Sequence, residues 1–250
     1  MKNLLIAILF LSGINAFGQS NAQEKGGIKL TPVTDSPLFP ESSLKQVSPE
    51  DNSVLSINAV RFKYEVKNFE LTIQTTDAQD KHCSNSAKGQ HIHLILNNEP
   101  YLAKYESDFT ETLKDGHYVA LSFLSRSYHE SLKHKKAYSI NQFTVGNQTY
   151  PKVDLKKPLL FYSRPKAEYV GDDAKKVLLD FYLVNVKLSP NGYKVKATIN
   201  GTEFIITDWQ AYAMEGLPLG ENTIKLELLD KTGAPVKSAY NSSERKITLK

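Results

Sequence analysis

The chain repeats itself, and this internal similarity constrains its fold more than any other feature. Four blocks from the first half recur in the same order in the second half. They pair residues 64–71 with 181–188, 89–97 with 192–200, 119–124 with 224–229, and 143–145 with 247–249. Between the first two blocks, the first copy carries the long segment 72–88 where the second copy has only Ser189–Asn191. The repetition predicts two domains related by internal duplication.

Each copy reads as short strands separated by turns. Apolar and polar residues alternate with the period of two that is typical of a strand with one buried face. The 13 tyrosines and 11 phenylalanines add to this preference. The spacing predicts an all-β fold of two tandem immunoglobulin-like β-sandwich domains, residues 53–147 and 166–250. Residues 148–165, which contain three prolines, are interpreted as the linker.

The first 52 residues predict export. Residues 1–18 have a basic Lys2, an eight-residue apolar run at Leu4–Leu11 and a small-x-small cleavage site at Ala16–Gly18, as in a signal peptide. The run is shorter than the roughly 20 residues that a membrane-spanning helix needs. Residues 19–52 are rich in Gly, Ser, Pro, Asn and Glu and predict a flexible leader. We expect a periplasmic or secreted protein with no membrane span after cleavage.

Charge and cysteine content exclude two classes. The 250 residues carry a net charge of +4, and both signs are interspersed along the chain, which is too mild for nucleic-acid binding. Cys83 is the single cysteine, so an intrachain disulfide framework is excluded. The expected partner is an extracytoplasmic ligand or protein that the sequence does not identify.

The histidines gather in one copy. All six lie between positions 82 and 134, and the second copy has Lys194 and Lys196 where the first has His91 and His93. Because the second copy keeps the apolar framework without histidine, the fold itself does not require these residues. On a strand, side chains two apart point to the same face, so His91 and His93 project together, on the side of Ile95.

This pattern predicts a transition-metal site. Imidazole and thiolate side chains are the ligands that zinc and copper accept. The candidate ligands are His91, His93, His117, His129 and Cys83. The alternative is that the histidine pair lies on a solvated or hydrogen-bonded face of an exposed strand and binds no metal.

Enzymatic alternatives have less support. Cys83 beside His82 or His91 suggests a thiolate nucleophile, but nothing identifiable supplies an oxyanion hole. The spacing of His129, Glu130 and His134 differs from the zinc-protease motif. We therefore expect a non-enzymatic binding protein.

Two resemblances extend this interpretation. Residues 89–97 (GQHIHLILN) and 115–134 resemble a family of small exported bacterial β-domains of unknown function, whose strand reads GHHHLLID; Gln90 replaces its first histidine. The full chain resembles exported bacterial two-domain β-sandwich proteins loosely labelled phosphopeptide-binding. That resemblance implies the alternative function, a peptide-, phosphopeptide- or glycan-binding adhesin-like module without metal. Ser125 and Arg126 would then contact an anion or ligand, because a guanidinium binds anions bidentately.

Overall fold

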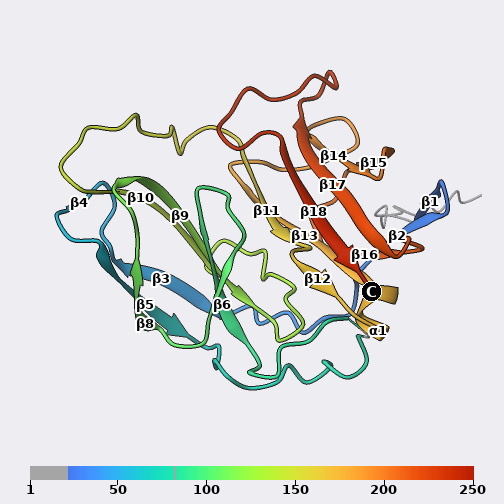
Figure 1. Ribbon diagram of the computed structural model, residues 1–250, viewed down its shortest axis with the longest axis horizontal. Helices are drawn as coiled ribbons and strands as arrows, with labels where there is room; N and C mark the ends of the chain where they lie inside the picture. The colour runs from blue at the N-terminus through green and yellow to red at the C-terminus, as the bar shows by residue number, and fades with distance from the viewer. Residues whose placement is uncertain (1–21, 82) are drawn as a thin grey trace, which may run out of the picture.

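The computed structural model describes residues 22–81 and 83–250, which form an all-β molecule of two units lying side by side (Figure 1). Alternating side chains build its sheets: in β5, for example, every second residue of Ala59–Tyr64 is buried. The first unit has a three-stranded sheet in the order β3 (Ser43–Ser48), β5 (Ala59–Lys67), β8 (Asp108–Thr112). Its five-stranded sheet runs β4 (Val54–Leu55), β10 (Tyr138–Val145), β9 (Gly116–Ser125), β6 (His91–Leu96), β7 (Leu102–Lys104).

The second unit has two five-stranded sheets. One runs β1 (Gln23–Lys25), β2 (Ile28–Pro32), β16 (Tyr212–Glu215), β13 (Val177–Val184), β11 (Leu159–Arg164). The other runs β12 (Glu168–Tyr169), β18 (Ser243–Leu249), β17 (Gly220–Leu229), β14 (Lys194–Ile199), β15 (Thr202–Ile206). The short helix α1 (Asp172–Lys175) precedes β13. This arrangement is consistent with the predicted tandem of immunoglobulin-like β-sandwiches.

The four sheets enclose three separate hydrophobic layers. Each unit has its own core, with Ile92 and Leu94 of β6 in the first and Leu179 and Phe181 of β13 in the second. A third layer lies between the units, where the outer face of β6 and β9 packs on β11 and β13. There the ring of Phe123 stacks on that of Tyr182 with 4.6 Å between centroids. This middle layer explains why both faces of β6, β11 and β13 are buried.

The two five-stranded sheets that hold β6 and β14 have the same strand order. β4, β10, β9, β6 and β7 occupy the places that β12, β18, β17, β14 and β15 occupy in the second unit. Asn97 and Asn200, both with positive φ, end β6 and β14, and each side-chain oxygen accepts a hydrogen bond from a backbone N–H of the next long strand, at 2.8 and 2.9 Å. Three of the four repeating sequence blocks fall on strands with matching positions in these two sheets. The first block does not, because residues 64–71 begin on β5 of the three-stranded sheet and residues 181–188 begin on β13 of a different five-stranded sheet.

The N-terminal segment differs from the predicted leader. From Gln23 onward it is ordered into strands, and β1 and β2 form a hairpin whose turn residues, Gly26 and Gly27, have φ of +59° and +77°. Glycine adopts such angles without steric cost. β2 pairs with β16 of the second unit, whereas β3 pairs with β5 of the first. The segment that was expected to be mobile thus joins both units.

The predicted linker also differs from the structure in its second half. Residues 159–164 form β11, which pairs antiparallel with β13 and is fully buried. The prolines at 158 and 165 suggested a linker, but they lie directly before and after the strand. Residues 1–18, the predicted signal peptide, and His82 lie outside the described residues. No helix in the described part of the chain is long and apolar enough to cross a membrane.

Candidate metal centre

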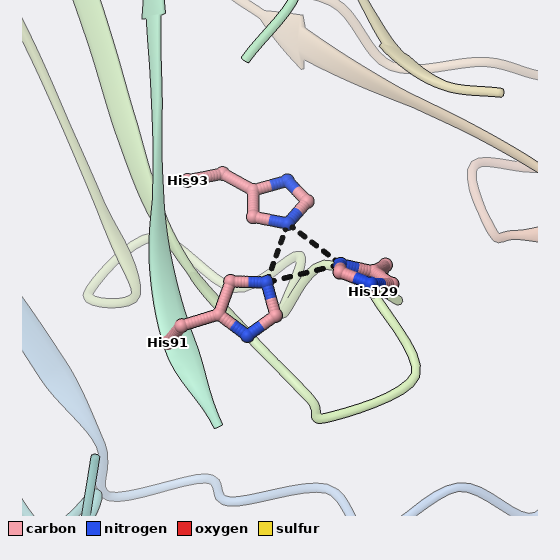
Figure 2. Close-up of side chains that lie close together, drawn as sticks. All are labelled: His91, His93 and His129. Carbon is pink, nitrogen blue, oxygen red and sulfur yellow. Dashed lines mark hydrogen bonds between the residues drawn. The ribbon is translucent and has the colours of Figure 1, made fainter. Parts of the chain in front are cut away.

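Three histidine side chains converge at the junction of the two units (Figure 2). His91 and His93 come from β6, and His129 comes from the loop between β9 and β10. The Nε2 atoms of His91 and His93 are 2.9 Å apart. Nδ1 of His129 lies 3.1 Å from Nε2 of His91 and 3.5 Å from Nε2 of His93. These residues form a triad that can hold a metal ion.

The spacing of the three nitrogens suits a metal ion. Two imidazole nitrogens bound tetrahedrally to zinc, each about 2.0–2.1 Å from the metal, lie about 3.3–3.4 Å from each other. The three separations in the triad, 2.9, 3.1 and 3.5 Å, lie close to that value. Three protein ligands leave one position of a tetrahedron open for another ligand.

The outer nitrogens of the two strand histidines have partners that orient their rings. Nδ1 of His91 donates to the carbonyl oxygen of Gly89 at 2.8 Å, which leaves the lone pair of its Nε2 facing the triad. Nδ1 of His93 lies 3.4 Å from Oγ of Ser163, a residue of β11 in the second unit. Metal-bound histidines generally have such a second partner, which fixes the tautomer.

Gly89 is required where it stands. Its φ is +81°, and a Cβ built there would lie 2.3 Å from the carbonyl oxygen of Ile73. Only glycine therefore allows the chain to enter β6 with the Gly89 carbonyl close to His91. His129 also has a positive φ, +67°, in a tight loop where its N–H donates to the carbonyl of Arg126. This uncommon backbone conformation turns its imidazole toward β6.

Tyr101 forms one wall of the site. Its ring stacks on the ring of His93, with 3.7 Å between centroids and 6° between planes. Its hydroxyl lies 3.3 Å from Nδ1 of His129. A metal bound to His93 would lie in the plane of the imidazole ring. The Tyr101 ring is nearly parallel to that plane, so its hydroxyl lies beside the metal position and can donate a hydrogen bond to a ligand on the metal.

Burial keeps the triad uncharged. Burial is the main cause that lowers the pKa of His91 to about 4; the hydrogen bond to Gly89 opposes this shift, and the nearby Arg164 and Lys166 add to it. Burial likewise holds the pKa values of His93 and His129 well below the ordinary value. Neutral imidazole is the form that binds metal. His91 and His93 are 0% exposed, so they do not lie on the solvated face considered as the alternative.

His117 lies away from the triad, contrary to its inclusion among the candidate ligands. β9 pairs with β6 so that Ser125 is opposite His91, which places His117 eight residues, or about 26 Å, further along the strand. Its ring nitrogens lie 3.2 Å from Oγ1 of Thr144 and 3.0 Å from Oε1 of Gln142. The sequence could not give the position of His117 along the strand, because that position depends on the register of β9 against β6.

Cys83 also lies apart from the triad. It is buried beside α1, lining a cavity of about 480 Å³ with Asp172 and Lys176. Burial raises the pKa of its thiol, which disfavours the thiolate. Cys83 is not among the three residues that converge, and a reactive thiolate has no support in this environment.

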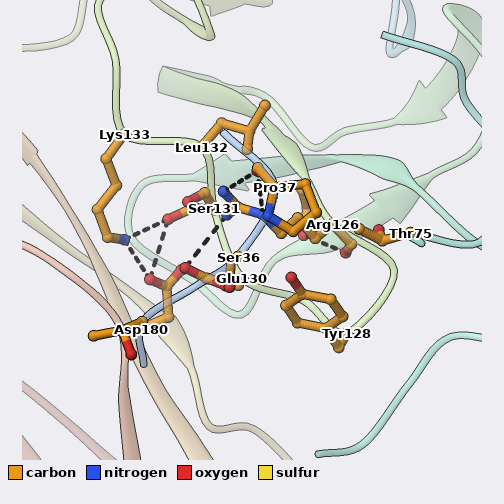
Figure 3. A network of polar contacts seen from close by, with 12 residues as sticks. Ser36, Pro37, Thr75, Arg126, Tyr128, Glu130, Ser131, Leu132, Lys133 and Asp180 are labelled. Atoms are coloured by element: carbon orange, nitrogen blue, oxygen red, sulfur yellow. Dashed lines mark hydrogen bonds and ion pairs between the residues drawn. The ribbon is translucent and has the colours of Figure 1, made fainter. Parts of the chain in front are cut away.

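Arg126 and Ser125, the candidate anion contacts, are engaged with the protein itself. The guanidinium of Arg126 donates to the carbonyl of Pro37 and pairs with Glu130 at 3.3 Å (Figure 3). Ser125 is fully buried and donates to the carbonyl of Arg126. Ser36 completes the group with a 2.6 Å hydrogen bond to Glu130. This network holds the loop that carries His129.

Several site residues were not identified from the sequence. Gly89 lies in the recognised stretch 89–97 but was given no role there, and Tyr101 and Ser163, which were not named as candidates, approach the triad only through tertiary packing. The glycine before the histidine strand is the one signal that sequence reading could have used, since such a glycine marks a close backbone approach. Tyr101 and Ser163 could not be found without the pairing of β6 with β7 and the docking of β11.

No family model matches the chain, and no curated protein matches it. Similar solved structures include fibronectin(III)-like modules of Clostridium thermocellum CbhA, 12% identical, covering 83% of this chain and 94% of that chain with a TM-score of 0.29. Domains 4 and 5 of the S-layer protein SbsC are 11% identical, covering 83% and 96% at a TM-score of 0.22. The Bacteroides ovatus SGBP-B, in complex with a mixed-linkage heptasaccharide, is 7% identical, covering 83% and 70% at 0.26.

Proposed function

We propose that this chain is an exported, non-enzymatic metal-binding protein whose triad of His91, His93 and His129 holds a zinc or copper ion. The observation that carries the proposal is the convergence of three imidazole nitrogens within 2.9–3.5 Å of one another. Without a cation, a proton on Nε2 of His93 can be donated in a hydrogen bond to Nε2 of His91, as their 2.9 Å separation allows. A metal ion would take the place of that proton and accept a lone pair from each of the three nitrogens.

The donor set limits which metals fit. Imidazole nitrogen suits zinc and copper, and among the described residues no thiolate joins the three histidines. The predicted set of five ligands is thereby reduced to three, with His117 and Cys83 left out. The Gly89 carbonyl and the Ser163 hydroxyl supply the outer contacts that orient the imidazoles of His91 and His93.

The matching strand order of the two sheets supports an internal duplication. In that interpretation Lys194, which faces Leu229 as His91 faces Ser125, is the counterpart of His91. In the sheet that holds β14, the face that carries Lys194 is open to solvent, and Lys196 there pairs with Glu203 and Glu227. In the sheet that holds β6, the corresponding face is covered by β11 and β13 of the second unit. The metal site would then be an addition made after duplication, at the surface where the units meet.

The test is titration calorimetry of the purified, metal-stripped protein with Zn²⁺ and Cu²⁺ at neutral pH. We expect one ion per chain, lost when His91→Ala and His93→Ala are combined. His117→Ala is the matched control and should leave binding unchanged, because His117 lies about 26 Å along β9 from the site. Absence of binding by the native chain, or binding that survives the double substitution, would overturn the proposal.

Export is tested separately. Expression with a periplasmic fractionation and N-terminal sequencing should give a chain that begins at Gln19, the residue after the predicted cleavage site. An intact Met1 in the soluble intracellular fraction would contradict it.

A further inference from the structure

A group of basic side chains lies next to the histidine triad. Arg164 ends β11, Lys166 follows two residues later, and Arg245 comes from β18. Arg164 is 5% exposed, and the other two are partly buried. Removing a charged group from water is costly unless an opposite charge or a full set of hydrogen bonds compensates it.

No carboxylate forms an ion pair with these cations in the part of the chain that the structure describes. Nε of Arg164 is buried without a hydrogen-bond partner. Arg245 donates to the carbonyls of Ser163 and Asn98, and the charge of Glu99 acts on it from outside ion-pair distance. Arg164 and Lys166 are therefore positively charged without a paired carboxylate.

Tyr101 connects the basic group to the triad. One face of its ring stacks on His93 at 3.7 Å, and Nζ of Lys166 lies 3.8 Å from the same ring centroid. Since the imidazole fills one face, the ammonium occupies the other. Lys166 also donates to the Tyr101 carbonyl at 2.8 Å, and Cζ of Arg164 lies 5.8 Å from the ring.

The field of these cations extends over the whole triad. Arg164 and Lys166 each lower the pKa of all three histidines, and no carboxylate acts in the opposite direction on any of them. The same surroundings lower the pKa of Lys166 itself to about 8, mainly through burial and then through Arg164 and Arg245. A Zn²⁺ or Cu²⁺ ion bound to the three neutral imidazoles would add two positive charges next to those of Arg164 and Lys166.

We propose that the metal ion takes a small carboxylate or inorganic oxyanion as its fourth ligand, with Arg164 and Lys166 compensating the charge and the Tyr101 hydroxyl donating a hydrogen bond. The inference rests on the proposed metal site and adds the class of ligand that this site receives. A neutral fourth ligand would leave the metal ion, Arg164 and Lys166 without an anionic partner. An anion satisfies the metal and the basic group together.

The experiment has two stages, so that failure of the metal site and failure of the anion site are separate results. Calorimetry first measures Cu²⁺ affinity. Acetate and inorganic phosphate are then titrated into the Cu²⁺-loaded protein while its visible absorption is recorded. We expect a saturable spectral change with acetate, phosphate or both. The stronger of the two identifies whether the ligand is a carboxylate or a phosphate-like oxyanion.

Charge-removing variants locate the anion. Lys166→Gln and Arg164→Gln should each weaken anion binding by about tenfold, because each removes one positive charge that attracts the anion. Cu²⁺ affinity should stay the same or rise. Lys63→Gln removes an equal charge from an exposed position on β5 and should change neither value. Lys166 is only partly buried, so its variant tests the proposal even if Arg164→Gln fails to fold.

Two results would overturn the anion inference while leaving the proposed metal site intact. One is that neither acetate nor phosphate changes the spectrum of the Cu²⁺-loaded protein, and the other is that Lys166→Gln binds the anion as tightly as the native chain. A native chain that binds no Cu²⁺ overturns the proposed function and this inference with it.

Discussion

His93 of the first unit faces Ser163 of the second, with 3.4 Å between Nδ1 and Oγ. In the metal-bound tautomer Nδ1 of His93 carries the proton, and this N–H donates a hydrogen bond to the Ser163 hydroxyl. One unit thus supplies the ligand and the other fixes its orientation. The metal site is consequently sensitive to how the units dock, although all three ligands belong to the first.

Ser163→Ala removes that outer contact without touching a ligand. We expect metal affinity to fall about tenfold, the lower end of the effect seen when an outer-shell partner is lost. Competition titration against a chelator of known affinity measures it. Ser139→Ala, on the partly exposed stretch of β10, is the control and should bind as the native chain does. Equal affinity in both variants would show that Ser163 does not orient His93.

Metal binding should stabilise the folded chain, because the unfolded chain cannot assemble the triad. With free metal at a hundred times its dissociation constant, the free energy of unfolding should rise by about 2.7 kcal/mol. Urea unfolding with and without Zn²⁺ measures this increase. It should vanish when His91→Ala and His93→Ala are combined and persist in His117→Ala. An increase that remains in the double variant would place the ion elsewhere.

The stability of the metal-free protein should depend on pH through the triad. An unfolded histidine titrates near pH 6.5, whereas burial lowers the pKa of folded His91 to about 4 and also lowers those of His93 and His129. The folded state then binds fewer protons than the unfolded state between these values. The stability is present above about pH 6.5 and is lost as the pH falls toward 4.

The slope measures how many imidazoles take part. Each contributes up to about 1.4 kcal/mol per pH unit within that window. Urea unfolding at several pH values in the presence of a chelator gives the slope. His129→Gln should make it shallower, and a native chain with no loss of stability down to pH 4 would refute the assignment.

The sequence predicted the faces of β6 correctly but not what covers them. Alternation placed Ile92 and Leu94 in one core and put Ile95 with the histidines, and both cores contain these residues as expected. It could not show that Phe161 and Tyr182 pack over the histidine face, because inward-facing and interface residues are equally apolar. His129 was named a candidate, but its approach depends on a positive φ in a loop, which no periodicity encodes.

The predicted leader shows a signal that was present but not used. Gly26-Gly27 lies between short alternating stretches, and such a pair favours a two-residue hairpin turn. Composition alone made the segment look mobile. Pairing of β2 with β16 joins residues far apart in sequence, which is why only the structure reveals that the segment belongs to the second unit.

The junction of the units also contains an ion pair whose removal should be costly. Nζ of Lys133 contacts Asp180 of β13, and Ser131 donates to the same carboxylate oxygen at 3.1 Å (Figure 3). The Asp180 side chain is 0% exposed. Asp180→Ala would leave the Lys133 ammonium largely buried without its partner, so the free energy of unfolding should drop by about 3 kcal/mol.

A double substitution separates lost charge pairing from lost packing. Lys133→Met with Asp180→Leu replaces both charges by apolar groups and should cost clearly less than Asp180→Ala alone, because no buried charge is left unpaired. Chemical unfolding gives both values, with Lys246→Met, which removes an exposed partner of Glu221, as the control expected to lose less than about 1 kcal/mol. If Asp180→Ala is as mild as this control, the pair does not hold the units together. Loss of metal affinity alongside stability in Asp180→Ala would further show that the triad depends on docking, since Asp180 touches none of its ligands.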